Sequence, residues 1–377
     1  MSLKSKLGIG SNDKRPNNDS VDYSLVVIIF MLLTFGLVMV FSASSANAHY
    51  VHGDATYFFK RQLIWAVAGV VIMFLVSRFH YKKLERYANL LFTVTVIMLL
   101  LVPFIGVEAG GAKRWLGFGS LTFQPSEFVK ITLIMFIAKS LVNNPDRVNE
   151  LKNGYIRYMA LIVITAALVL IQPHMSGAMV IAISGCIVLF AAGFKMKYFV
   201  ISVGGALPLV YTLIMTSDYR RKRFTSFLDP FKDKQDESWQ IVQSLYAIAS
   251  GGLYGMGLGQ SRQKFLYIPE PQNDFIFAVI CEELGFLGAL FVMFLFALLI
   301  WKGIMIARNA PDEFSSLTAT GITSLIAVQV LLNIAVVTSS MPVTGITLPF
   351  FSYGGTSLVI LLIGMGILLN ISRYSNK

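Results

Sequence analysis

Ten long apolar runs, separated by polar segments, are the feature that most constrains how this chain of 377 residues can fold. A helix needs about 20 mostly apolar residues to cross the hydrocarbon of a bilayer. Several runs are shorter, which helix tilt and buried helix ends allow. The pattern predicts an all-α polytopic membrane protein with ten transmembrane helices. The runs cover residues 24–41, 63–76, 90–107, 123–141, 158–171, 178–194, 199–215, 275–301, 317–337 and 348–371.

The composition excludes the other broad classes of protein. Hydrophobic residues make up 55% of the chain and charged residues 14%, whereas soluble domains carry about 25% charged residues. A disordered chain would need low hydrophobicity, and a disulfide scaffold would need more than two cysteines. Cys186 and Cys281 both lie inside apolar runs, so we interpret them as small hydrophobic residues.

The net charge of +11 is explained by membrane topology rather than by a nucleic-acid partner. Short cytoplasmic loops of membrane proteins accumulate Lys and Arg. With both termini inside, the short outer loops hold only Lys60, Arg61, Lys113 and Arg114, and the inner segments hold most of the others. We therefore predict an N-in, C-in topology.

Three regions follow from this topology. Residues 1–23 are polar and form a predicted disordered cytoplasmic tail, and residues 372–377 form a second one. Residues 24–371 form a single transmembrane domain. The first apolar run ends in a Ser/Ala-rich segment that imitates a signal-peptidase site. The run is long for a signal peptide, and we predict an uncleaved first span.

One predicted extracytoplasmic loop, residues 217–273, is far longer than the usual connection of 2–8 residues between packed helices. Apolar residues recur at helical spacing between Trp239 and Ala249, which predicts an amphipathic helix at the membrane surface. Two interpretations of this basic loop stay open, a lipid-facing anchor and a cover over an anionic substrate. Its glycine-rich part, 251–259, lacks the spacing of a nucleotide-binding loop and predicts a tightly turning segment.

Ionisable residues inside predicted spans usually mark a functional site. Glu127 and Lys130 lie three residues apart, on one face of a helix, and are able to pair. Asp274 begins the eighth span, and Glu282 and Glu283 follow it. The structural alternatives are an ion pair that locks two helices, an N-cap role for Asp274, and hydrogen bonds from the glutamates to neighbouring helices.

The segment 341–357 joins the last two spans and combines two prolines, three glycines and several hydroxyl residues. This predicts an irregular backbone, which is tolerated at membrane depth only where it is buried in protein or lines a watery cavity. The alternative is a plain loop.

Five motifs in this order and spacing resemble the SEDS family of bacterial cell-wall polymerases, whose members include RodA, FtsW and SpoVE. The resemblance runs from about residue 24 to the end of the chain, and residues 259–264 and 369–375 are more similar to FtsW and SpoVE than to RodA. The motifs are Lys113-Arg114-Trp115 with Gln124-Pro125-Ser126-Glu127 and Lys130, then Gln243-Ser244-Leu245, then Gly257 to Lys264, then Pro269 to Gly285, and finally Pro342 to Ser357.

The resemblance implies a peptidoglycan glycosyltransferase that polymerises lipid II, an undecaprenyl-pyrophosphate-linked disaccharide pentapeptide, on the outer membrane face. It implies that Asp274 is the essential acid, and a carboxylate there can deprotonate the attacking sugar hydroxyl. Lys130, Arg114 or the arginines of the long loop are the expected cations for the departing pyrophosphate, and Glu127 would keep Lys130 charged and oriented. A divalent cation, Mg²⁺ or Mn²⁺, is a further option. The residues expected to bind substrate are Arg114, Trp115, Gln243, Lys264, Arg220, Arg223 and Ser352.

The family also implies a partner, a class B penicillin-binding transpeptidase, and a place among the division or sporulation wall-synthesis proteins. Two alternatives stay open, a lipid II flippase with no chemistry of its own and a scaffold that recruits a wall synthase. Glu127, Asp274 and the basic loop crowd the predicted outer half, whereas a flippase needs charges along a path to both faces.

One residue departs from the family pattern. The family usually has Gln-Pro-Asp-x-Gly-Thr where residues 172–177 of this chain place His174 at the acid position. Histidine titrates near pH 6.5, so an active role would alter the pH dependence. A structural role would change little.

Overall fold

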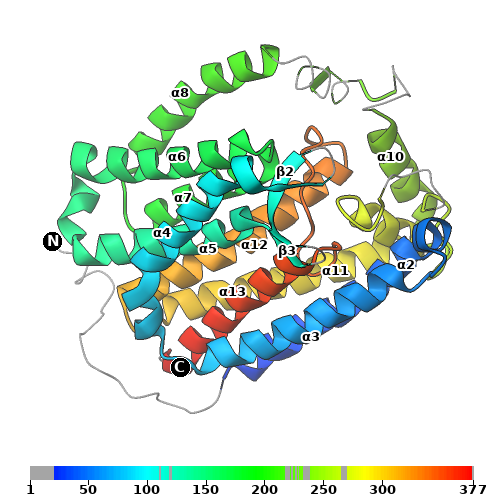
Figure 1. Cartoon of the computed structure of the whole chain (residues 1–377), viewed down its shortest axis with the longest axis horizontal. Helices are drawn as coiled ribbons and strands as arrows, with labels where there is room; N and C mark the ends of the chain where they lie inside the picture. The colour runs from blue at the N-terminus through cyan, green and yellow to red at the C-terminus, as the bar shows by residue number, and fades with distance from the viewer. Residues whose placement is uncertain are drawn as a thin grey trace.

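Each of the ten apolar runs contains a helix in the computed structural model, and the long helices form one bundle (Figure 1). The structure describes residues 21–109, 112–118, 121–216, 221, 224–225, 227, 229–231, 238–264 and 270–375. The ten helices are α2 (Tyr23–His52), α3 (Tyr57–Arg78), α4 (Tyr81–Ile105), α5 (Pro125–Asn143), α6 (Arg157–Ile171), α7 (Met175–Ala191), α8 (Met196–Met215), α11 (Ile276–Arg308), α12 (Glu313–Val337) and α13 (Gly355–Tyr374).

Seven helical segments in the described part of the chain are long and apolar enough to cross a membrane. They are α2, α3, α4, residues 151–171, α11, α12 and α13. The segment 151–171 joins a π-helical turn, η2 (Leu151–Ile156), to α6, and a 3₁₀ turn, η1 (Pro145–Asn149), precedes it. Length and composition thus support a multi-pass membrane protein.

Small residues allow the helices of the bundle to approach closely. α13 packs along α3, where a Cβ at Gly366 would lie 2.6 Å from the backbone oxygen of Met73 and a Cβ at Gly69 would lie 2.5 Å from the Leu362 side chain. Small residues at such interfaces are the usual means by which helices pack in lipid.

Two helix boundaries differ from the predicted spans. α2 starts after the N-cap Asp22, whose side chain accepts a hydrogen bond from Leu25 N, and continues through the Ser/Ala segment to His52. α13 begins at Gly355, whereas the predicted span begins at residue 348. Residues 338–354 form no helix. Pro349 and the left-handed Phe350 (φ 66°) keep the preceding turn out of the helix.

The all-α prediction was incomplete, because a small antiparallel sheet lies between α4 and α5. Its strands β1 (Val107–Ala109), β2 (Ala112–Phe118) and β3 (Leu121–Phe123) pair in the order β1-β2-β3. Two of them have only three residues, too few to show the alternation that predicts a strand. Thr356 Oγ1 donates to Thr122 O at 3.0 Å, which links the sheet to the start of α13.

The helix predicted between residues 239 and 249 is present as α10 (Trp239–Gly251). Its apolar face packs against α11, with Ile241 and Val242 almost fully buried. Ser244 Oγ donates to Val337 O at 2.8 Å, which attaches α10 to the end of α12. The apolar face of this helix is therefore turned toward the protein.

The glycine-rich segment after α10 turns tightly, as predicted, and docks against a break in α11. Gly285 has φ 68° and ψ −168°, which interrupts the helical hydrogen bonds of α11. Phe286 N then donates to Gly252 O at 2.8 Å, and Gly257 N donates to Glu283 O at 2.9 Å. A Cβ at Gly255 would overlap the backbone oxygen of Glu283, so this approach requires glycine.

Candidate functional site

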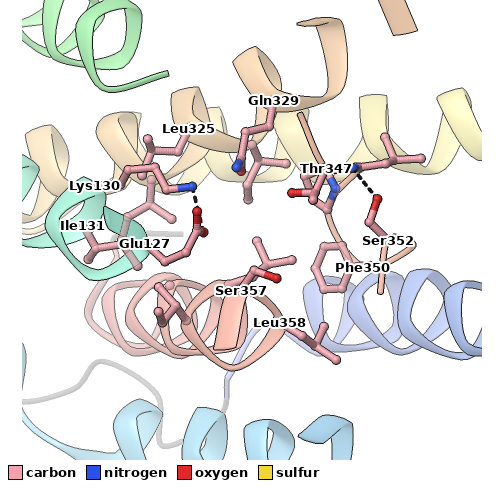
Figure 2. Close-up of a pocket in the computed structure, with 17 residues that line it drawn as sticks. Glu127, Lys130, Ile131, Leu325, Gln329, Thr347, Phe350, Ser352, Ser357 and Leu358 are labelled. Atoms are coloured by element: carbon pink, nitrogen blue, oxygen red, sulfur yellow. Dashed lines mark hydrogen bonds and ion pairs between the residues drawn. The ribbon is translucent and has the colours of Figure 1, made fainter. Parts of the chain in front are cut away.

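A cavity of about 50 Å³ between α5, α12 and α13 contains Glu127, Lys130 and Ser352 among its lining residues (Figure 2). The irregular segment between α12 and α13 closes one side of it, through Thr347, Phe350 and Ser352. Gln329 of α12 and Ser357 of α13 also face it. The predicted role of an irregular backbone at a cavity is confirmed for this segment.

The predicted pair on α5 is present: Lys130 Nζ lies 2.8 Å from Glu127 Oε2. Both residues are at least nine-tenths buried. α5 begins at Pro125, which has no N–H to satisfy, and this places Glu127 in the first turn, where the helix dipole favours a carboxylate. The buried Lys130 ammonium therefore has the Glu127 carboxylate as its counter-charge.

Asp274 lies immediately before α11 and next to the irregular segment. A Cβ at Gly345 would lie 3.2 Å from Asp274 Oδ2, so the carboxylate faces the backbone there. Asn333 of α12 holds the two segments together, because its Nδ2 donates to Asp274 O at 2.8 Å and to Ile346 O at 2.7 Å. The N-cap of α11 is Phe275, one position later than the alternative considered for Asp274.

Ser352 connects the cavity to the segment that carries Asp274. Its Oγ donates to Asn273 O at 2.7 Å and accepts a hydrogen bond from Leu348 N at 2.7 Å. Tyr353 N donates to Gln272 O at 2.8 Å, directly beside it. Residues 348–353 and 272–274 therefore run side by side, and Asp274 is held next to the cavity that contains Lys130.

Arg114 and the turn that carries His174 lie close to the segment beside Asp274. Arg114, on β2, donates to Gln172 O at 3.2 Å and also to Pro173 O, which fixes the turn before α7. Ser176 Oγ donates to Gly345 O at 3.1 Å, which attaches this turn to the segment beside Asp274.

The position that departs from the family pattern holds a neutral imidazole. Burial lowers the pKa of His174 to about 4, with Arg114 and Lys130 acting in the same direction and Glu127 opposing them. His174 Nδ1 lies 3.4 Å from Ser176 Oγ. The side chain therefore lies within electrostatic reach of the Glu127–Lys130 pair.

Lys264 forms a buried ion pair away from this cavity. Its Nζ lies 2.9 Å from Glu283 Oε1, and Glu283 also accepts a hydrogen bond from Ser42 Oγ of α2. Glu282 accepts from Ser261 Oγ at 2.5 Å and from Arg262 N at 2.9 Å. We call Lys264, Glu283, Ser42, Ser261 and Glu282 the loop clasp. It fastens residues 261–264 to α11 and α2.

The remaining residues predicted to bind substrate have separate places. Trp115 pairs with Val107 in the sheet and is partly exposed. Gln243 is buried on α10. Neither lines the cavity that contains Glu127, among the residues that the structure describes. Arg220 and Arg223 lie outside the described residues.

Asn333 and Ser42 are not among the residues predicted from the sequence. Asn333 lies within an apolar run and is fully buried, so the rule for polar residues inside spans would have found it. Ser42 carries no such signal, because a small hydroxyl residue is common in helices that cross membranes.

No three His, Cys, Asp or Glu side chains are arranged to hold a metal ion in the described ranges. A divalent cation, Mg²⁺ or Mn²⁺, stays a prediction of the sequence.

The comparison with known proteins decides the family. A model of the FtsW, RodA and SpoVE cell cycle proteins matches residues 23–377. The chain belongs to this family. Stage V sporulation protein E of Bacillus subtilis (strain 168) is 44% identical over 359 residues, which cover 94% of this chain and 98% of that one. The probable peptidoglycan glycosyltransferase FtsW of Trichlorobacter lovleyi is 43% identical over 353 residues, 93% of each chain.

Solved structures agree with the sequence relatives. A chain of a peptidoglycan synthase complex that coordinates polymerization and crosslinking superposes with a TM-score of 0.81 at 28% identity, covering 95% of this chain and 100% of that one. RodA of Thermus thermophilus gives a TM-score of 0.71 at 27% identity, with 96% and 100% covered. The predicted SEDS membership and the peptidoglycan glycosyltransferase class are confirmed, and a transporter without chemistry is not favoured.

Proposed function

We propose that this protein polymerises lipid II at the outer face of the cytoplasmic membrane, with Asp274 as the general base. The observation that carries the proposal is the placement of Asp274 and of the Glu127–Lys130 pair around one irregular segment. Gly345 of that segment faces Asp274, and Thr347 to Ser352 line the cavity with Lys130. The same irregular segment thus lies against a candidate base and lines the cavity that holds a buried cation, the two kinds of group that a glycosyl transfer from a diphosphate uses.

The reaction can be written on these groups. The oxygen of an acceptor sugar hydroxyl forms a bond to the anomeric carbon of the donor sugar, and its proton passes to the Asp274 carboxylate. The bond between that carbon and the diphosphate oxygen breaks, and the diphosphate leaves with the electron pair. Lys130 supplies positive charge near the departing oxygens, held in place by Glu127 at 2.8 Å. Arg114, on β2, adds a second cation, which donates to the turn at residues 172–173.

The charge distribution supports an N-in topology with ten spans and the site outside. Several basic residues gather at the opposite end of the bundle, where Lys302 pairs with Asp22, Lys139 donates to Arg86 O, and Arg373 donates to Ser77 O. The positive-inside rule assigns that end to the cytoplasm. Asp274 and the Glu127–Lys130 pair then lie toward the end of the bundle that faces the outer leaflet.

A class B penicillin-binding transpeptidase is the proposed partner, because the peptidoglycan synthase complex contains a chain with this fold. The relatives named stage V sporulation protein E and FtsW support a proposed place of action at a division septum or a sporulation site. Such a partner would cross-link the strands that this chain makes.

The deciding experiment is polymerisation of lipid II by the full chain with its transpeptidase partner. We expect Asp274→Asn to lower the rate by roughly 10²–10⁴-fold, the usual contribution of a general base. Asp54→Asn is the matched control, since Asp54 is an exposed aspartate that pairs with Lys60 at 2.9 Å. Thermal unfolding of each variant in detergent checks the fold. Polymer made by Asp274→Asn at the wild-type rate would remove Asp274 as the base.

A further inference from the structure

One side chain of α12, that of Asn333, joins the segment that carries Asp274 to the irregular segment before α13. Its Nδ2 donates to Asp274 O at 2.8 Å and to Ile346 O at 2.7 Å, so both hydrogens of the amide are used. Asn333 has no exposed surface. Because water does not reach the side chain, its amide stays bound to these two carbonyl oxygens, which belong to two different segments of the chain.

The bridge fixes the backbone on both sides of the Asp274 carboxylate. A Cβ at Gly345, the residue before Ile346, would lie 3.2 Å from Asp274 Oδ2. Gly345 has φ 68°, a left-handed conformation that favours glycine. Asn333 therefore holds Asp274 by its own carbonyl and, through Ile346, also holds the backbone that the carboxylate faces.

The helix that carries Asn333 also contacts the part of the site that contains the cation. Gln329 lies one turn before Asn333 on the same face of α12, and it lines the cavity with Lys130. α12 packs against α5, the helix on which Lys130 lies. One helix is thus in contact with the Asp274 segment through Asn333 and with the Lys130 helix through its own packing.

The chemistry of the bridge is specific to an amide. The Asn333 side chain supplies two N–H donors on a short stem. Leucine has the same branching and no donor, an ionised aspartate has only acceptors, and serine has one donor. Substitutions at this position can therefore remove one hydrogen bond or both, which grades the strength of the bridge.

We propose that Asn333 is a positioning residue that holds the Asp274 carboxylate in a fixed place relative to Lys130. This deepens the proposed function and rests on it. Asn333 is fully buried, so it acts through the backbone of Asp274 and Ile346 and not by contact with substrate. Its loss should slow the proton transfer to Asp274 and leave the binding of lipid II nearly unchanged, since a displacement of about 1 Å costs roughly 100-fold in rate.

Asn370 of α13 offers a matched control. It is also a fully buried asparagine, and its Nδ2 donates to backbone carbonyls, among them Ser77 O at 2.9 Å and Val76 O at 3.4 Å. Its Oδ1, like that of Asn333, accepts no hydrogen bond within the described part of the chain. Asn370 lies at the other end of the bundle, where Arg373 donates to Ser77 O. Loss of either amide should therefore cost similar stability, and only the loss of Asn333 should slow the reaction.

The test compares Asn333→Leu with Asn370→Leu in the full chain with its transpeptidase partner. Thermal unfolding in detergent should show similar falls in melting temperature. In lipid II polymerisation, Asn333→Leu should lower kcat about 10–100-fold with KM changed less than about twofold, whereas Asn370→Leu should keep kcat within about twofold. Asn333→Ser keeps one donor, and its kcat should fall between those of the wild type and Asn333→Leu.

Three results would overturn the proposal. The first is an equal kcat for Asn333→Leu and Asn370→Leu, and the second is a change confined to KM. The third is failure of both Asn333 variants to fold under conditions in which Asn370→Leu folds, because the role of Asn333 would then be structural.

Deuterium exchange of backbone amides measures the positioning without any turnover. Residues 270–276 and 343–350 should exchange several-fold faster in Asn333→Leu than in the wild type, at a temperature well below unfolding, because the bridge between them is lost. Asn370→Leu should leave their exchange unchanged. Equal exchange of these residues in both variants would contradict the proposed bridge.

The outcomes separate this inference from the proposed function. If Asp274→Asn polymerises lipid II at the wild-type rate, the proposed base fails, whatever Asn333→Leu does. If Asp274→Asn is inactive and Asn333→Leu keeps the wild-type kcat, the positioning role fails alone. The double variant Asp274→Asn/Asn333→Leu should lose no more activity than Asp274→Asn, because Asn333 acts through Asp274, and additive losses would exclude this role.

Discussion

Lys264 Nζ lies 2.9 Å from Glu283 Oε1, and both residues are almost completely buried. These residues are separated by the stretch of chain that carries Asp274, so the pair closes a loop around the proposed base. Removing one partner of a buried ion pair costs about 3–5 kcal/mol, because the other charge is left uncompensated.

Glu283→Gln should therefore lower the melting temperature of the purified protein and reduce polymerisation. The double variant Lys264→Met/Glu283→Leu should recover part of the lost stability, since buried ion pairs are often replaced by apolar residues at little cost. Thermal unfolding in detergent measures both. A double variant less stable than Glu283→Gln would contradict this account of the loop clasp.

The Glu127–Lys130 pair should respond unequally to its two substitutions. Lys130→Met removes the cation and is expected to slow lipid II polymerisation by about 10²–10³-fold, the scale of one lost electrostatic group at a transition state. Glu127→Gln keeps the cation, so the loss should be smaller, about tenfold. Lys139→Met is the control, because Lys139 lies at the far end of the same helix and donates to Arg86 O. Equal rates for Lys130→Met and Lys139→Met would exclude the proposed role.

His174 should make stability depend on pH. Its pKa is lowered to about 4 in the folded protein, mainly by burial, from 6.5. The unfolded chain therefore binds a proton first as the pH falls, and stability present above pH 6.5 is lost between pH 6.5 and 4. The loss is at most about 1.4 kcal/mol per pH unit. Melting temperatures of wild type and His174→Gln across this window measure it, and parallel curves would refute the prediction.

Gly36 of α2 should resist replacement because of Phe350. A Cβ at Gly36 would overlap the backbone oxygen of Phe350, whose own φ of 66° is already unfavourable for a side chain. Gly36→Ala should cost about 1–3 kcal/mol through overpacking and displace the turn that lines the cavity. At Gly205 of α8 a Cβ meets nothing within 4 Å, so Gly205→Ala should be neutral or stabilising by up to about 1 kcal/mol. Melting temperatures of both variants decide this.

Much of the fold could be read from local pattern. The apolar runs predict the helices, because a backbone in hydrocarbon must satisfy its own hydrogen bonds. The spacing of Glu127 and Lys130 predicts their pair, and the spacing of apolar residues predicts α10, since neighbours on one helix are set by its pitch. Pro342, Pro349 and the glycines predict that the segment before α13 leaves the helix.

Other features depend on residues far apart in the chain. Lys264 was predicted to bind substrate, and only the tertiary structure shows it paired with Glu283 and Ser42. The contact between Ser352 and Asn273 spans 79 residues, and the short strands around Arg114 show no periodicity. Local sequence determines which segments become helices and which residues share a helix face. Which charges end in a cavity and which are neutralised depends on how the helices pack, and that information is not contained in any single stretch of the chain.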